Sequence, residues 1–114
     1  MKIVAQHDIR KRIDSELNLA HKARSQGNEG RARVCARRAA GWAVAAYRQR
    51  NFGIEPHANA FRQLRWLRTL EGASQEIRDA ASRLTTRVSL DHSLPHDEDP
   101  LEDARMLIQA LLGS

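Results

Sequence analysis

Apolar residues recur along the chain at intervals of three and four positions, the spacing of one face of an α-helix. The first such stripe predicts a helix with Asp8 as its N-cap and an end near Ser25. Gly27, Asn28 and Gly30 then form a short turn, so a second helix should pack against the first as an antiparallel hairpin. The apolar positions of the first helix are Ile9, Ile13, Leu17 and Ala20.

The second helix, expected over residues 31–51, carries small side chains on two faces. Small side chains let another helix approach closely, so this helix should be the central one. One face would contact a neighbour within the chain, and the other is available to a second subunit. The first face consists of Ala32, Cys35, Ala36, Ala39, Ala43, Ala46 and Tyr47, and the second of Val34, Gly41 and Ala45.

Three further helices follow a loop that contains Gly53 and Pro56. The third should run from about His57 to Glu71 with Gly72 as its C′ residue, and Ser74 should cap the fourth. The last helix starts at the run D-P-L-E, residues 99–102, which combines an N-cap, a proline at the first helical position and a Glu three residues after the cap. The inward residues are Ala60, Leu64, Leu67 and Leu70, then Ile77, Ala80, Ala81, Leu84 and Val88, and finally Leu101, Ala104, Leu107, Ile108, Leu111 and Leu112.

These patterns predict an all-α protein, a four- to five-helix up-and-down bundle in one domain over residues 1–114. No apolar run approaches the roughly 20 residues needed to span a bilayer, and the N-terminal residues do not form a signal peptide. A single cysteine, Cys35, fits a reducing compartment, and we interpret it as a small buried residue. We therefore expect a cytoplasmic protein with no membrane contact.

Charge is divided unevenly along the chain. Residues 1–90 contain 18 basic and 8 acidic side chains, whereas residues 91–114 contain 1 and 6. Such a basic field attracts nucleic acid or an acidic partner surface. The alternative is a solvated basic face that the chain's own acidic end partly neutralises. The arginines expected to bind nucleic acid or a partner are Arg37, Arg38, Arg48, Arg62, Arg65 and Arg68, the last three forming a ridge on the third helix.

Most familiar signals of chemistry are missing. The sequence has no Gly-rich phosphate loop, no nucleophile elbow and no cysteine pair for zinc. His92 and His96 have the spacing of two helical metal ligands, but Pro95 lies between them and no third ligand follows. We expect no metal and no cofactor. Trp66 falls between the two faces of the third helix, which favours a residue at the edge of the core over a base-stacking platform.

One pair of residues has the chemistry for RNA cleavage. Arg50 and His57 are separated by six residues, so a folded-back loop would let the arginine hold a phosphate while the histidine moves a proton of a ribose hydroxyl. The structural alternative is that His57 makes one local hydrogen bond near the start of the third helix, while Arg50 lies at the end of the second.

The second helix and the segment after it read ARVCARRAAGWAVAAYRQRNFGIEPHANAFRQL. This run resembles the small-residue helix, the loop with Gly, Pro and His, and the Leu-rich helix of the HEPN family of small prokaryotic helical-bundle proteins. LTTRV and DPLEDARMLIQALL continue the similarity over roughly the whole chain. The resemblance implies a bundle that is commonly homodimeric and is often encoded beside a minimal nucleotidyltransferase in two-component or toxin–antitoxin systems.

Two functions follow from the resemblance. In the first, which we favour, the chain is a binding module without catalysis whose basic face engages a nucleotidyltransferase-type partner or nucleic acid. In the second it is a homodimeric, metal-independent endoribonuclease. Some HEPN relatives are ribonucleases with an arginine and a histidine separated by four to six residues, a spacing that Arg50 and His57 meet at its upper limit, although earlier in the chain than in those relatives. A structural dimer without a ligand is a third possibility.

Overall fold

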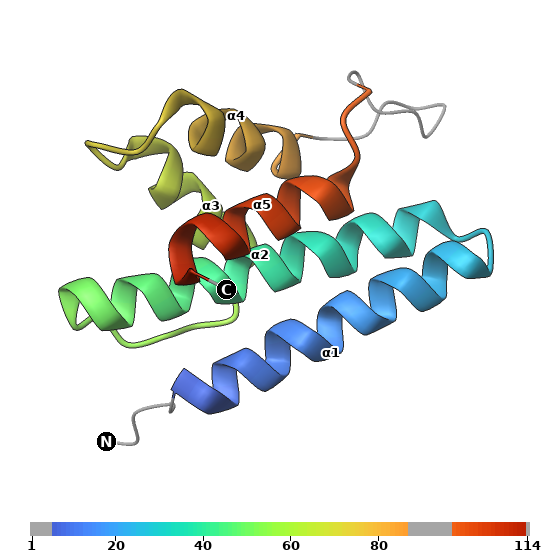
Figure 1. Ribbon diagram of the computed structural model, residues 1–114, viewed down its shortest axis with the longest axis horizontal. Coiled ribbons are helices and arrows are strands. Elements are labelled where there is room, and N and C mark those ends of the chain that lie inside the picture. Colours follow the sequence, from blue (N-terminus) through green and yellow to red (C-terminus); the bar gives the residue numbers. More distant parts are fainter. Residues whose placement is uncertain (1–5, 87–96, 114) are drawn as a thin grey trace.

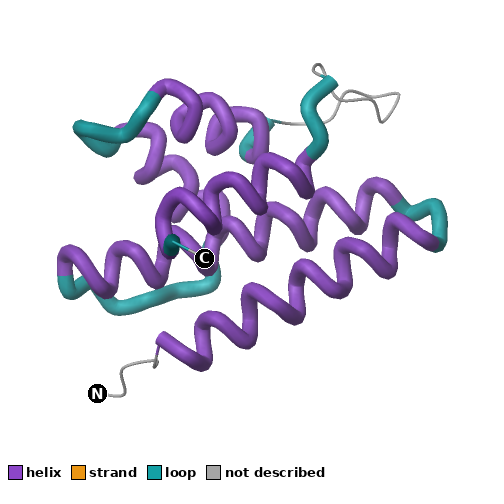
Figure 2. The backbone as a smooth tube through the Cα atoms, in the orientation of Figure 1, coloured by secondary structure: helices purple, strands orange, loops and turns teal. Residues whose placement is uncertain are grey.

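Five α-helices make up the computed structural model, which describes residues 6–86 and 97–113. They are α1 (Gln6–Ser25), α2 (Glu29–Phe52), α3 (Ala60–Thr69), α4 (Gln75–Leu84) and α5 (Pro100–Leu112). Within those two ranges no residue is in a strand, as Figure 2 shows, so the prediction of an all-α bundle is confirmed. None of the helices found there is both long and apolar enough to cross a membrane. Val88, His92 and His96 lie outside the described residues.

The helices are arranged around α2, as the sequence predicts. Figure 1 shows α1 and α2 as a long antiparallel hairpin, with α5 lying along α2 and the shorter α3 and α4 beyond it. The helix α2 contacts α1, α3 and α5, while α4 packs against α3 and α5. This arrangement places α3 across the middle and the carboxyl-terminal half of α2.

Small residues allow α2 to be covered on two sides. Gly41 illustrates the second side, because a Cβ atom built there would lie 2.7 Å from both Cα and Cβ of Ala60, the first residue of α3. The expectation that this strip is available to another subunit is therefore wrong, since Gly41 and Ala45 are buried within the chain. The buried residues of α2 are Ala32, Cys35, Ala36, Ala39, Ala40, Gly41, Ala43, Val44, Ala45 and Ala46.

Side chains that accept backbone N–H groups mark the starts of four helices. Ser74 and Asp99 cap α4 and α5 as predicted, each accepting a backbone N–H of the first turn. Asp8 is not an N-cap, because α1 already begins at Gln6 and the carboxylate lies in its first turn. The turn after α1 is shorter than the sequence indicates, because Asn28 caps α2 and Gly30 is helical.

The third helix is shorter than predicted at both ends. It begins at Ala60 instead of His57, because the side chain of Asn59 accepts the N–H of Arg62 and forms the cap. It ends at Thr69 with Leu70 in an extended conformation, so Gly72 lies in the following turn and is not the C′ residue. The prediction for the third helix is thus correct in its core and wrong at its boundaries.

The core joins the apolar stripes of all five helices. Leu64 and Leu67 of α3 and Leu101 and Leu107 of α5 are fully buried with the small residues of α2. Trp66 is partly buried against this core, which confirms its predicted place at the edge.

Candidate functional site

The first arginine cluster joins α2 to α3 through the ring of Phe61. The guanidinium of Arg37 lies 4.3 Å from the ring centroid, and that of Arg65 lies 5.9 Å from it. Burial lowers the pKa of Arg37, and the neighbouring charges of Arg33 and Arg38 lower it further. Among the residues that the structure describes, no carboxylate pairs with Arg37 to offset these effects.

A second cluster surrounds Arg48, near the carboxyl end of α2. Its guanidinium lies 4.6 Å from the ring centroid of Trp66, and its Nη1 donates a hydrogen bond to Oε1 of Gln63 at 3.0 Å. Its Nε is buried and has no hydrogen-bond acceptor. Burial lowers the pKa of Arg48, and Arg62 lowers it further. The guanidinium plane is therefore fixed by a ring and an amide, and no carboxylate of the described residues pairs with it.

Three aromatic rings extend this second cluster. Phe52 packs edge-on against Trp66 with 5.6 Å between centroids, and Tyr47 lies 6.3 Å from each of the two rings. The residue Phe52 is 53% exposed. A large apolar ring thus faces solvent beside a fixed arginine.

His57 lies in the linker between α2 and α3 and is tied to it locally. Its Nδ1 accepts the backbone N–H of Asn59 at 3.3 Å, and its carbonyl oxygen accepts from Nε2 of Gln63 at 3.2 Å. Burial lowers the pKa of His57, and the charges of Arg62 and Arg48 lower it further. The imidazole is therefore neutral at pH 7, and the hydrogen bond to Nδ1 assigns the ring proton to Nε2.

Arg50 is exposed in the last turn of α2. The charged groups that act on His57 are Arg62 and Arg48, and Arg50 is not among them. The pairing of Arg50 with His57 for catalysis stays a prediction.

The predicted binding arginines do not all lie together. We name the group linked by contacts the arginine face: it consists of Arg37, Arg48, Arg62 and Arg65 with the rings of Phe61 and Trp66. Arg68 is exposed in the last turn of α3. Arg38 points elsewhere, because its Nε lies 3.3 Å from Oε2 of Glu16 on α1. Sequence reasoning missed Phe61 and Gln63 as anchors of the arginines. Phe61 and Arg65 are four positions apart on one helix, and this spacing could have indicated their contact from the sequence.

The acidic end of the chain neutralises other arginines. Asp99 pairs with Arg24 on α1 at 2.8 Å, and Asp103 pairs with Arg83 on α4 at the same distance. Glu102 pairs with Arg105 inside α5. Across residues 6–86 and 97–113, no carboxylate forms an ion pair with the arginine face.

No group of three metal-ligating side chains is found in the part of the chain that the structure describes. Comparisons with family models, with curated proteins and with solved structures give no significant match. The geometry of the arginine face therefore carries the functional argument.

Proposed function

We propose that this chain is a binding module without catalysis that holds single-stranded RNA on the arginine face. The observation that carries the proposal is a set of four arginines without carboxylate partners in the described residues, three of them held against aromatic rings. A guanidinium fixed in this way loses little conformational entropy when it donates paired hydrogen bonds to a phosphate. Burial and neighbouring positive charges lower the pKa values of Arg37 and Arg48, and a bound anion would offset both effects.

Aromatic exposure favours RNA over an acidic protein surface. A carboxylate would gain binding free energy from the arginines alone. A nucleotide would gain binding free energy from the arginines and also from a ring on which its base stacks. Phe52 offers such a ring beside Arg48 and Trp66. Only an unpaired base exposes its face for stacking, so a single strand fits better than a duplex.

The HEPN resemblance stays a prediction, and it is compatible with a binding module as well as with a ribonuclease. The homodimer and the nucleotidyltransferase partner that it implies remain part of the proposal.

Catalysis by Arg50 and His57 has less support than binding. A general base needs a free ring nitrogen, but Nδ1 of His57 already accepts a hydrogen bond. A general acid needs a protonated ring at working pH, and the lowered pKa of His57 opposes this state. The ribonuclease alternative is tested by incubating the same RNA in EDTA, where cleavage by the protein that disappears in His57→Ala would replace our proposal.

The test of the proposal measures fluorescence anisotropy of a labelled mixed-sequence single-stranded RNA over a series of salt concentrations. The variant Arg62→Gln/Arg65→Gln removes two exposed charges of the arginine face. The control Lys22→Gln/Arg105→Gln removes two exposed charges from α1 and α5. We expect the slope of log affinity against log salt to fall by about 0.7 for each phosphate that the arginines no longer neutralise, in the first variant alone.

Equal losses of affinity in the two variants would show that net charge, and not the arginine face, attracts RNA. Polyglutamate that competes as strongly as RNA at the same salt would assign the face to an acidic protein partner instead.

A further inference from the structure

His57 is connected to the arginine face by one buried amide. Nε2 of Gln63 donates a hydrogen bond to the carbonyl oxygen of His57 at 3.2 Å, and Oε1 of the same amide accepts one from Nη1 of Arg48 at 3.0 Å. Gln63 is 1% exposed, so both bonds are shielded from water. The linker histidine is therefore held at a fixed place beside the guanidinium of Arg48.

The ring of His57 accepts a hydrogen bond that only its neutral form can accept. Its Nδ1 accepts the backbone N–H of Asn59, and the side chain of Asn59 accepts the N–H of Arg62 as the cap of α3. Both ring nitrogens of a protonated histidine are donors. A proton on Nδ1 would therefore remove an acceptor at the start of α3.

Positive charge acts on this ring from α2 and α3. Burial lowers the pKa of His57, and the charges of Arg62 and Arg48 lower it further. In the part of the chain that the structure describes, no carboxylate is among the groups that act on the ring. A histidine in this position takes up a proton only when something offsets the two arginines.

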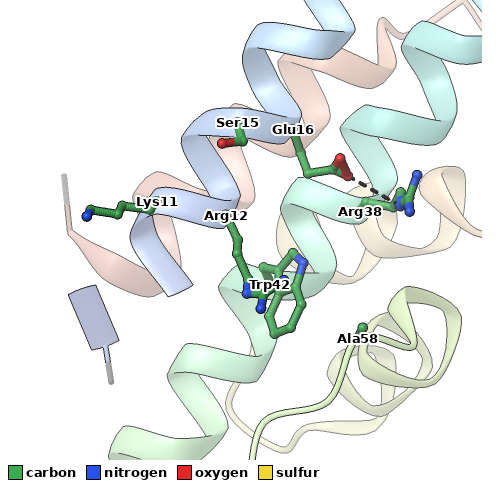
Figure 3. Close-up of a pocket in the computed structure, with 7 residues that line it drawn as sticks. All are labelled: Lys11, Arg12, Ser15, Glu16, Arg38, Trp42 and Ala58. Carbon is green, nitrogen blue, oxygen red and sulfur yellow. Dashed lines mark ion pairs between the residues drawn. The ribbon is translucent and has the colours of Figure 1, made fainter. Parts of the chain in front are cut away.

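The other charged groups near the linker do not offset them. Ala58 lines a hollow between the linker, α1 and α2, together with the charged side chains of Lys11, Arg12, Glu16 and Arg38. Figure 3 shows Glu16 directed toward Arg38, and the two form an ion pair at 3.3 Å. Neither these four groups nor Glu55 and Arg50 are among the charges that shift the pKa of the histidine. The two arginines therefore decide the electrostatics of the ring.

An anion bound to Arg48 and Arg62 would reverse this balance. Its negative charge offsets both guanidinium groups, and a protonated imidazole can also donate a charge-assisted hydrogen bond to a phosphate oxygen. A ligand that raises the pKa of a group takes up a proton when it binds, so its affinity rises as the pH falls. The other described histidines, His7 and His21, lie on α1.

We propose that His57 makes binding to the arginine face dependent on pH: a bound phosphate group draws a proton onto the imidazole, and binding tightens as the pH falls from about 8 towards about 6. The inference rests on the proposed function, because it concerns the control of the same site. It gives the linker histidine a role that requires no bond cleavage.

Isothermal titration with a single-stranded RNA tests the proposal at about pH 6.5 in two buffers of different ionisation enthalpy, which together give the number of protons taken up. The RNA has a 5′-hydroxyl end, because a terminal phosphate itself titrates near pH 6. We expect net proton uptake. Between pH 8 and pH 6 the affinity should rise by up to about tenfold for each unit by which the bound phosphate raises the pKa of His57.

Two substitutions identify the responsible group. The side-chain oxygen of His57→Asn can accept the N–H of Asn59 as Nδ1 does, but it does not titrate. This variant should lose the proton uptake and the pH dependence while its affinity at pH 8 is unaltered, and circular dichroism checks that it is folded. The matched control His21→Asn removes an exposed histidine of α1 and should keep both.

Nuclear magnetic resonance of the wild-type imidazole signals measures the pKa of His57 directly, in the free protein and with inorganic polyphosphate, a polyanion without bases. We expect polyphosphate to raise it. RNA binding without proton uptake, or uptake that persists in His57→Asn, would overturn the inference and leave the proposed function standing. A rise with polyphosphate in a protein that does not bind RNA would overturn the proposed function and support the control by His57. If neither polyanion binds, both fail.

Discussion

Replacing Gly41 by alanine should destabilise the fold, although alanine is the better helix former. In a helix interior the substitution gains about 1 kcal/mol from propensity. At this position the added Cβ would lie 2.7 Å from the Cα and Cβ of Ala60. Those atoms belong to the start of α3 and cannot rotate away, so α3 must shift. Overpacking costs about 1–3 kcal/mol, and two contacts at 2.7 Å with atoms that cannot rotate lie in the upper part of that range. After the gain in propensity is subtracted, we expect Gly41→Ala to lower the free energy of unfolding by about 1–2 kcal/mol.

Urea unfolding followed by helical circular dichroism measures this change as a lower midpoint at unchanged slope. Gly30→Ala is the matched control in the same helix, because the nearest atom to its added Cβ is Oδ1 of Asn28 at 3.8 Å, an ordinary contact. This control should be neutral or slightly stabilising. Adding Ala60→Gly to Gly41→Ala should recover part of the stability, since one of the two close contacts disappears. A midpoint for Gly41→Ala at or above that of the wild type would refute the close approach of α3 to α2.

Three further predictions concern charge and burial. Asp103→Ala should destabilise the fold by about 1–3 kcal/mol, because it leaves a partly buried arginine of α4 without its two hydrogen bonds; Glu102→Ala, in an exposed pair, should cost under about 1 kcal/mol in the same urea assay. The hydrogen bonds from Arg24 lower the pKa of Asp99, so this pair contributes stability that is present above the ordinary pKa and is lost as the pH falls through the lowered one. Asp99→Asn should therefore flatten the loss of stability below about pH 4, measured by thermal unfolding across pH, and an unchanged profile would contradict the linkage. Burial raises the pKa of the Cys35 thiol, so iodoacetamide should label it slowly in native protein and rapidly in urea, followed by mass spectrometry; equal rates would contradict its burial.

Features that depend on a few neighbouring residues could be predicted from the sequence. The start of α5 is one, because the side chain of Asp99 and the fixed φ of Pro100 act within a single turn. The start of α3 shows the limit of this reasoning. His57 and Asn59 both suit a helix start, and the choice depends on the hydrogen bonds that Asn59 makes with Arg62 and with the ring of His57.

The candidate site could be predicted only as a set of arginines. Their chain positions do not show that Arg37 reaches Phe61 or that Arg48 reaches Trp66, because both contacts depend on how α3 crosses α2. The crossing brings Ala60 close to Gly41, a contact that only the tertiary fold reveals. For the same reason the sequence did not separate Arg38 from the arginine face.

The acidic and basic parts of the sequence also lie in different parts of the fold. The acidic end folds back so that Asp99 and Asp103 meet Arg24 and Arg83, which lie on α1 and α4. Had the same carboxylates reached α3, they would have neutralised the arginine face and removed its attraction for a polyanion. The ion pairs that hold α5 in place therefore also leave the positive charge of α2 and α3 available to a ligand. Variants that weaken RNA binding should accordingly map to α2 and α3, while variants of the α5 ion pairs should change stability and leave affinity nearly unaltered.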